Sequence, residues 1–358
     1  MDSAVSGLRA HQNKLDVIGH NIANVNTYGF KSQSYTFKDT MYQTSTASTN
    51  GTATAGGVNA AQYGYGALMG VISMDMTAST PTYKGGFNAT IDGDGFFITK
   101  STKDDTGITG ITSSVADTDK LKGSDLEFTR VGQFTVDSNG FVTDGNGNFV
   151  YGFRMVNNEV DDTTLRALRV PTGGGDLELV DGQLRIKQTT DAIGQELEAI
   201  SIQVNKMGDI QVSVKVQYLT TTDNTTNPPT VTNTVLRADG KLPNGNAPTV
   251  DANNVINENT FTVKMGQLAL ATFQNQEGLT KNGNGYYTAT PSDNTGVCSA
   301  GIPGDGRATL MPGYLEASNV DLATEFSDMI TTERGFQANS KIITVSDEIL
   351  SDLINMKR

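Results

Sequence analysis

The chain contains few of the residues on which catalytic, metal-binding or disulfide-stabilised proteins depend. Its 358 residues include no tryptophan, nine prolines, two histidines and one cysteine. The single Cys298 cannot form an intrachain disulfide, which excludes a disulfide-stapled scaffold. His11 and His20 lie nine positions apart, whereas a metal-binding pair on a helix needs a spacing of three or four. We therefore expect no metal site on these histidines.

Positive charge and long apolar runs are also scarce. The chain has 26 Lys and Arg against 39 Asp and Glu, a formal net charge of −13. Nucleic acids and anionic membrane surfaces both select basic proteins, so neither is an expected partner. No run of about 18 apolar residues could span a bilayer. Residues 1–8 lack the basic and apolar regions of a cleaved secretory signal, so none is expected.

Two segments rich in Asp and Gly, 92–95 and 144–148, superficially resemble calcium loops. An EF-hand loop needs glycine at its sixth position and glutamate at its twelfth. Neither segment has these residues there, and Asp-Gly is itself a strong turn signal, so we interpret both as hairpin turns. The glycine-rich segments 64–70 and 173–175 lack the spacing of a dinucleotide or phosphate loop. Cys298 lies in a predicted Gly-rich loop with no histidine nearby in sequence. We predict no enzyme, no cofactor and no catalytic or metal site.

Both ends of the chain have the apolar periodicity of a helix. In residues 1–30 apolar side chains recur at spacings of three, four or seven, and in residues 321–358 they follow a near-heptad rhythm. Asn319 or Asp321 could cap the second helix, and Gly335 would weaken it by up to ~1 kcal/mol relative to alanine. Such stripes pack most easily against each other or against the same helices of neighbouring chains, which is typical of an assembling subunit. The predicted assembly residues are Val5, Leu8, Leu15, Ile18, Ile22, Val25, Leu322, Phe326, Met329, Phe336, Ile343, Leu350 and Ile354; Ile342, Val345, Ile349 and Leu353 widen the C-terminal stripe.

Between the two helices the apolar period changes to two. Short strands separated by Asp, Asn and Gly turns are predicted at 128–131, 134–136, 141–143, 149–151, 200–204, 211–214, 261–263 and 268–271. We predict an α+β fold, in which N- and C-terminal helices pair as a coiled-coil-like domain and a central, mainly β body consists of hairpins.

The expected domain boundaries follow from these periods. The predicted inner helical domain comprises residues 1–30 and 321–358, and residues 31–70 form a linker whose part 44–57 has no apolar period. The predicted β body comprises residues 71–153 and 196–320, with a loop insertion at 220–260 and a possible outer elaboration at 154–195.

The segment 21–31, Asn-Ile-Ala-Asn-Val-Asn-Thr-Tyr-Gly-Phe-Lys, resembles the N-terminal signature of the flagellar rod and hook proteins. His20 stands where the family usually has a further asparagine. Similar motifs occur in register before and after this segment, at 6–10, 15–19, 37–39, 91–97, 128–134, 273–279, 313–322 and 329–340. The residues that match the signature are Asn21, Ile22, Ala23, Asn24, Asn26, Thr27, Gly29 and Phe30.

The resemblance implies a structural subunit of the extracellular flagellum, exported unfolded by the flagellar type III apparatus and polymerised into a helical tube. The segment 56–66 is similar to hook proteins of Gram-positive bacteria, which favours the hook, a flexible joint that transmits motor torque to the filament. The distal rod, the drive shaft of the basal body, is the alternative within the family; a secreted β-rich adhesin is the alternative outside it. The implied partners are the chain itself, the hook cap, distal rod and hook–filament junction proteins, and the type III export gate.

Phe37 and Met41 match the short aromatic-x-x-x-hydrophobic export signal of this family. The spacing would place both side chains on one face if the segment became helical on binding, which would provide two apolar anchors for a groove. The alternative interpretation is that Phe37 and Met41 pack under a neighbouring subunit.

Overall fold

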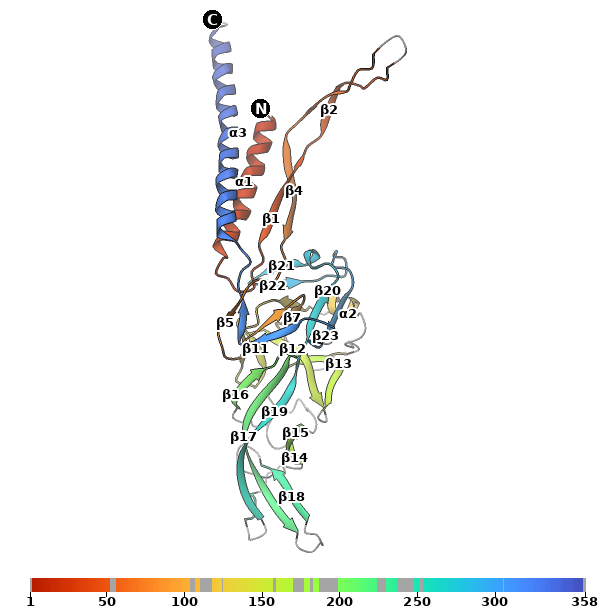
Figure 1. Ribbon diagram of the computed structural model, residues 1–358, viewed down its shortest axis with the longest axis vertical. Helices are drawn as coiled ribbons and strands as arrows, with labels where there is room; N and C mark the ends of the chain where they lie inside the picture. Colours follow the sequence, from red (N-terminus) through yellow and green to blue (C-terminus); the bar gives the residue numbers. More distant parts are fainter. Residues whose placement is uncertain are drawn as a thin grey trace. The chain divides into compact units, whose positions relative to one another are not determined.

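The computed structural model divides into two compact units, which Figure 1 shows in sequence colours. The helical unit comprises residues 1–77 and 318–358, and the β unit comprises residues 78–317. The structure describes residues 2–51, 56–103, 107–109, 118–123, 125–156, 159–169, 177–180, 183–186, 199–223, 230–236, 242, 247–250, 254–304 and 306–356. Within these ranges, no helix combines the length and the apolar character needed to cross a membrane.

The helical unit contains α1 (Asp2–Ala23) and α3 (Leu322–Met356), which lie side by side and run in opposite directions (Figure 1). Asp321 caps α3, because its Oδ1 accepts a hydrogen bond from the Ala323 N–H at 2.9 Å. Gly335 lies against α1: a Cβ there would be 2.6 Å from Cε1 of His11. The glycine therefore has a packing role that offsets its low helix propensity.

Residues 31–70, predicted as a linker, contain regular strands. Strands β1 (Gln33–Asp39) and β4 (Ala67–Met74) pair antiparallel, and so do β2 (Tyr42–Thr46) and β3 (Ala61–Gly64). A bridge between Thr49 and Val58 continues the pairing into the segment 44–57, of which 52–55 lie outside the described residues. The prediction was wrong because a hairpin is stabilised by partners distant in sequence, here Phe37 opposite Met69, and not by local apolar periodicity.

The β unit is built around one 15-stranded, antiparallel sheet with the core order β16-β17-β19-β12-β7-β9-β22-β21. Its elements in chain order are β5 (Pro81–Tyr83), β6 (Ala89–Asp92), β7 (Phe96–Lys100), β8 (Ile108–Thr109), α2 (Thr118–Gly123), β9 (Glu127–Thr129), β10 (Phe134–Val136), β11 (Val142–Asp144), β12 (Phe149–Val156), β13 (Glu159–Ala167), β14 (Leu177–Val180), β15 (Gln183–Ile186), β16 (Ala199–Val204), β17 (Asp209–Asp223), β18 (Thr230–Val235), β19 (Asn254–Leu268), β20 (Leu270–Phe273), the short helix η1 (Gln276–Gly278), β21 (Thr280–Gly283), β22 (Tyr286–Thr288), β23 (Cys298–Gly301), β24 (Thr309–Pro312) and β25 (Tyr314–Glu316). All the strands predicted from the period of two coincide with or overlap strands of this unit.

Aromatic side chains fill the core of the β unit. Phe96, Phe97, Phe128 and Phe153 are completely buried. The rings of Phe97 and Phe134 meet edge to face with centroids 5.1 Å apart, a favoured aromatic geometry. The predicted hairpins therefore share one hydrophobic interior.

Three expectations for the β unit need correction. The predicted loop 220–260 contains the end of β17, all of β18 and the start of β19. The sequence did not predict these strands because they are polar and rich in threonine, and lack the alternation of apolar residues by which a strand is recognised. In the predicted outer elaboration 154–195, β13 pairs with β12 in the main sheet, while β14 and β15 form a separate pair; residues 187–195 lie outside the described residues. Cys298 is buried in β23, opposite Phe273, and is not in a loop.

Candidate assembly surface

Asn21, from the signature segment, joins three parts of the helical unit. Its side chain is only 1% exposed. Its Oδ1 accepts a hydrogen bond from the Gln33 N–H at 3.0 Å, and its Nδ2 donates to the Gln33 carbonyl and to Glu325 Oε1, both at 2.8 Å. An amide side chain has a donor and an acceptor, so it can pair with the backbone of Gln33 as a strand would. Asn21 thereby ties the end of α1 to the start of β1 and of α3.

The following signature residues shape the turn after α1. Asn24 Nδ2 donates to the His20 carbonyl at 2.9 Å, and Thr27 Oγ1 donates to Asn24 Oδ1 at 3.1 Å. Gly29 has φ +67°, a left-handed conformation that favours glycine, and the Phe30 ring meets His20 edge to face at 5.4 Å. The other signature residues contribute less to this network: Ile22 is half-buried, while Ala23 and Asn26 are exposed.

Asn319, in the segment before α3, reinforces the same junction. Its Oδ1 accepts a hydrogen bond from the Ser32 N–H at 2.7 Å, and its Nδ2 donates to the Asp75 carbonyl at 2.9 Å. This asparagine belongs to the resembling segment 313–322, but its role depends on partners more than 200 positions away. Sequence reasoning considered it only as a helix cap.

Ionisable groups lie along the contact between α1 and α3. Lys14 Nζ is 3.4 Å from Asp328 Oδ2. Burial raises the pKa of Glu325, and the nearby Asp328 adds to this, while the hydrogen bond from Asn21 opposes it. Burial lowers the pKa of His11, and the charge of Lys14 lowers it further. The contact therefore favours a neutral imidazole at His11.

The His11 side chain is enclosed by three elements. Its ring lies 5.1 Å from the ring of Phe37 on β1, and Gly335 of α3 lies against it. The Nδ1 atom is buried and has no hydrogen-bond partner among the described residues. A proton added here would lie in an apolar contact, close to the positive charge of Lys14.

The predicted assembly residues of α1 are mostly covered within the helical unit. Ile18 is 3% exposed, and Val5 is 39% exposed at the start of the helix. Leu8, Leu15 and Ile22 are half-buried; α1 ends at Ala23, before the predicted end of the helix, so the half-buried Val25 lies in the turn that follows.

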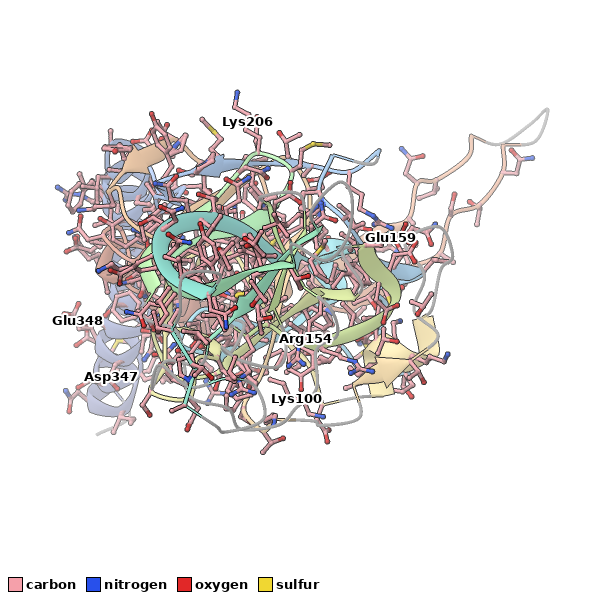
Figure 2. All side chains as sticks on the ribbon, turned by 90° about the horizontal axis from the view of Figure 1, so that it is seen from below. Lys100, Arg154, Glu159, Lys206, Asp347 and Glu348 are labelled. Atoms are coloured by element: carbon pink, nitrogen blue, oxygen red, sulfur yellow. The ribbon has the colours of Figure 1, made fainter. Side chains whose placement is uncertain are left out.

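The predicted assembly residues of α3 form a half-buried group and an exposed group. Met329, Phe336 and Ile343 are half-buried on the side that carries Gly335. Leu322, Phe326, Leu350 and Ile354 are exposed, the last by 68%. A further exposed stripe contains Ile342, Val345, Ile349, Leu353 and Met356. Acidic Asp347 and Glu348 point outward from the same part of α3 (Figure 2).

Phe37 and Met41, the predicted export residues, lie at the end of β1 and just beyond it, not on a helix. Phe37 is 41% exposed, and its ring lies tilted against His11 and edge to face with Tyr35, while Met41 is 81% exposed. The folded structure thus holds neither side chain on a helix, and the helix expected when the segment binds a groove stays a prediction.

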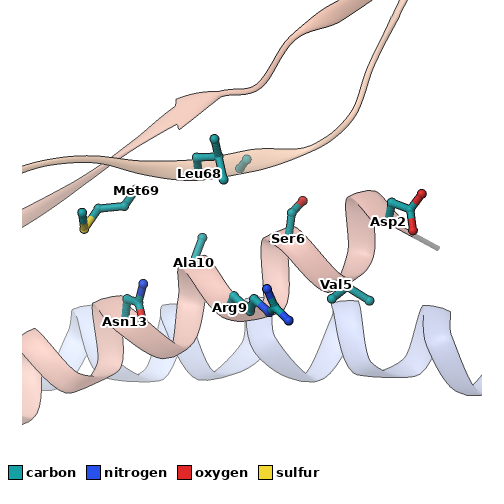
Figure 3. Close-up of a pocket in the computed structure, with 9 residues that line it drawn as sticks. Asp2, Val5, Ser6, Arg9, Ala10, Asn13, Leu68 and Met69 are labelled. Atoms are coloured by element: carbon teal, nitrogen blue, oxygen red, sulfur yellow. The ribbon is translucent and has the colours of Figure 1, made fainter.

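A groove of about 400 Å³ lies between α1 and β4. Ser6, Ala10 and Asn13 of α1 line one wall, and Leu68 and Met69 of β4 line the other (Figure 3). Asp2, Val5, Arg9 and Ala67 complete the lining.

The two segments weighed as calcium loops are turns between strands. Asp144 Oδ1 accepts hydrogen bonds from the N–H groups of Asn146 and Asn148 at 3.0 and 2.9 Å, and its Oδ2 accepts one from the Tyr286 hydroxyl. The segment 92–95 joins β6 to β7, and the Gly93 carbonyl accepts a hydrogen bond from Arg130. In the part of the chain that the structure describes, no three acidic, His or Cys side chains are grouped to hold a metal ion.

Comparison with known proteins identifies relatives along the whole chain. Residues 311–356 match the family described as flagellar basal body rod FlgEFG protein C-terminal, and residues 1–31 match the flagella basal body rod protein family. The flagellar basal-body rod protein FlgG of Bacillus subtilis is 33% identical, over 99% of this chain and 98% of the relative. The flagellar hook protein FlgE of Escherichia coli is 30% identical, over 99% of both chains. The flagellar hook protein FlgE of Borreliella burgdorferi is 26% identical, over 99% of this chain and 98% of the relative.

Proposed function

This chain belongs to the family of flagellar rod and hook proteins, and we propose that it is the subunit of the hook, which polymerises into a helical tube and transmits motor torque to the filament through a flexible joint. The resemblance inferred from the segment 21–31 is confirmed. Proteins of this family are structural parts of the flagellum and basal body that assemble with their own copies.

The hook assignment is carried by whole-length similarity to hook proteins of distantly related bacteria, at 26% and 30% identity. The distal rod is the second candidate, supported by the 33% identity to a rod protein. Family membership removes the adhesin alternative, because an adhesin would not share sequence with axial proteins along the entire chain.

The structural arrangement supports the mechanism of such a joint. In the proposed tube, α1 and α3 pair as a coiled-coil-like inner layer, and their exposed apolar side chains join neighbouring subunits tightly. The β unit contributes outer contacts through polar strands such as β17 and β18, on which threonines and asparagines exchange hydrogen bonds. Polar contacts of this kind exchange with water at low cost, so they can slide while the inner contacts hold.

We also propose that the subunit is exported by the flagellar type III apparatus without a cleaved signal. Phe37 and Met41 would engage the export gate before folding, and assembled subunits would contact the hook cap, the distal rod and the hook–filament junction proteins. Phe37 also packs on His11 in the folded unit, which supports a second, structural role.

Deletion of the gene in its own host distinguishes hook from rod. For a hook subunit, electron microscopy of isolated basal bodies should show complete rods without hooks, and the reintroduced gene should restore curved hooks. Rods that end early in the deletion strain would instead assign the chain to the distal rod.

A further inference from the structure

Helix α3 extends past the level of α1. Gly7 lies beside Asn339 and His11 beside Gly335, so the antiparallel pairing places Asp2 level with residue 344. The last 12 described residues of α3, Val345–Met356, thus have no α1 residue beside them among those described. They span about 18 Å at 1.5 Å per residue. We call this segment the α3 extension.

The α3 extension is apolar on two sides. At about 100° per residue, Val345, Ile349, Leu353 and Met356 form one stripe. Leu350 and Ile354 lie on another side, in line with the residues that face α1 earlier in the helix. All six are 43–77% exposed. A helix with two exposed apolar sides is best covered by a site with two walls.

The groove between α1 and β4 has two such walls. Its apolar lining comes from Val5 and Ala10 on the helix and from Leu68 and Met69 on the strand. Its volume of about 400 Å³ would hold roughly a dozen water molecules at ~30 Å³ each, or instead a few aliphatic side chains. Leu68 and Met69 are 49% and 48% exposed, so their apolar surface remains available.

Acidic side chains on the α3 extension can pair with one basic side chain in the groove. Glu348 and Asp352 flank one edge of the stripe on the α3 extension, by the same helical geometry. Arg9 is exposed and belongs to the lining of the groove, which also includes the acidic Asp2. An extension that entered with its acidic edge at the level of Arg9 would gain this attraction.

The α3 extension cannot fill the groove of its own chain. It continues straight beyond the first turn of α1, whereas the groove lies beside that helix, on the side that faces β4 (Figures 1 and 3). The α3 extension could reach the groove of its own chain only if α3 bent back on itself, which would break the helix. A contact between two different surfaces of identical subunits is heterologous, and such contacts propagate into an open helical polymer wherever the rotation between subunits does not close a ring.

We infer that the α3 extension of one subunit docks into the groove between α1 and β4 of a second copy of this chain. This inference rests on the proposed function, because it names the contact through which the inner layer of the polymer propagates. Ile349, Leu353 and Met356 insert between the helix and strand walls, and Arg9 pairs with the acidic edge of the incoming helix.

Cysteine cross-linking between two variants tests the contact. Full-length Met69→Cys and Leu353→Cys proteins are mixed, polymerised, and oxidised, and the products are separated without reductant. Cys298 is buried and stays in place. We expect a covalent dimer in the mixed polymer and none in a polymer of either variant alone. Val71→Cys mixed with Leu353→Cys is the matched control, because Val71 is on the same strand and exposed but does not line the groove.

A second measurement does not depend on disulfide geometry. Leu353→Ser should raise the critical concentration for polymerisation about tenfold, while Leu353→Met should change it by less than about threefold. Polymers that form normally, with no dimer and no effect of Leu353→Ser, would overturn the docking inference and leave the proposed function standing. Failure of the unmodified chain to polymerise would contradict the proposed function itself.

Discussion

Arg130 and Glu316 form an ion pair that is almost completely removed from water in the β unit. Their side chains are 0% and 2% exposed, and Arg130 Nη1 lies 3.7 Å from Glu316 Oε2. Nη1 also donates to the Gly93 carbonyl at 2.9 Å, and Glu316 Oε1 accepts from the Ser79 N–H at 3.2 Å. The Nε and Nη2 atoms of Arg130 have no partner among the described residues. Among the described residues, Glu316 is the carboxylate that pairs with the guanidinium, which also lies over the Phe96 ring at 5.2 Å from its centroid.

Replacing that carboxylate should strongly destabilise the β unit. Glu316→Gln keeps an oxygen for Ser79 but leaves the buried guanidinium without a counter-charge, so we expect a loss of about 3 kcal/mol in the free energy of unfolding. For a domain of this size the loss corresponds to a fall in Tm of roughly 6–12 °C. Urea unfolding of the full chain, followed by near-UV circular dichroism, measures the change.

The double variant Arg130→Met/Glu316→Gln separates the ion pair from simple loss of packing. It removes both charges, so its cost should be smaller than the sum of the two single variants by about 1–3 kcal/mol. The exposed pair Lys215–Glu258, 2.9 Å apart with 54% and 42% exposed side chains, provides the matched control. Glu258→Gln should change stability by less than about 1 kcal/mol. Equal effects of Glu316→Gln and Glu258→Gln, or additive costs in the double variant, would refute the reasoning.

Three further predictions concern the helical unit. Asn21→Ala should destabilise the helical unit by about 2–4 kcal/mol, because the backbone N–H and carbonyl of Gln33 both lose their partner. Asn26→Ala, at an exposed position, should cost less than about 0.5 kcal/mol. The two variants are compared by the loss of helicity of the assembled protein on heating, and equal melting would count against the junction. The pKa of His11 is lower in the folded chain than its ordinary 6.5, so the unfolded chain binds more protons and the stability of the helical unit should fall as pH drops below 6.5. His11→Gln should reduce this pH dependence of stability between about pH 7.5 and 5.5. An unchanged slope of stability against pH would show that other groups cause it. Phe37→Ala should cut secretion into the medium about tenfold in a strain that lacks the hook cap, where exported subunits cannot polymerise. Ile72 on β4 is equally exposed, and Ile72→Ala should leave secretion unchanged. Normal secretion of Phe37→Ala would leave only the packing role for Phe37.

Local sequence patterns were sufficient to predict the elements whose apolar residues recur at regular spacing. The terminal helices follow from apolar spacing, and the hairpins from 128 to 151 follow from alternation interrupted by Asp and Gly turns. Asp321 caps α3 as its residue type suggests, since a cap involves only neighbours within a few positions. The motifs at both ends also identified the family. These features depend on residues that are only a few positions apart in the sequence, so the sequence alone can predict them.

The tertiary structure decided everything that depends on distant partners. The segment 31–70 is interpreted as a linker from its sequence, yet its strands pair because residues 15 to 41 positions apart lie opposite one another across it. The sequence marks Asn21 as a signature residue and Asn319 as a possible helix cap, but only folding brings them to Glu325 and Ser32. The apolar periodicity of α3 predicted a stripe, but it could not divide that stripe into a side facing α1 and an exposed extension. That division depends on where Gly335 meets His11, a contact between residues separated by most of the chain.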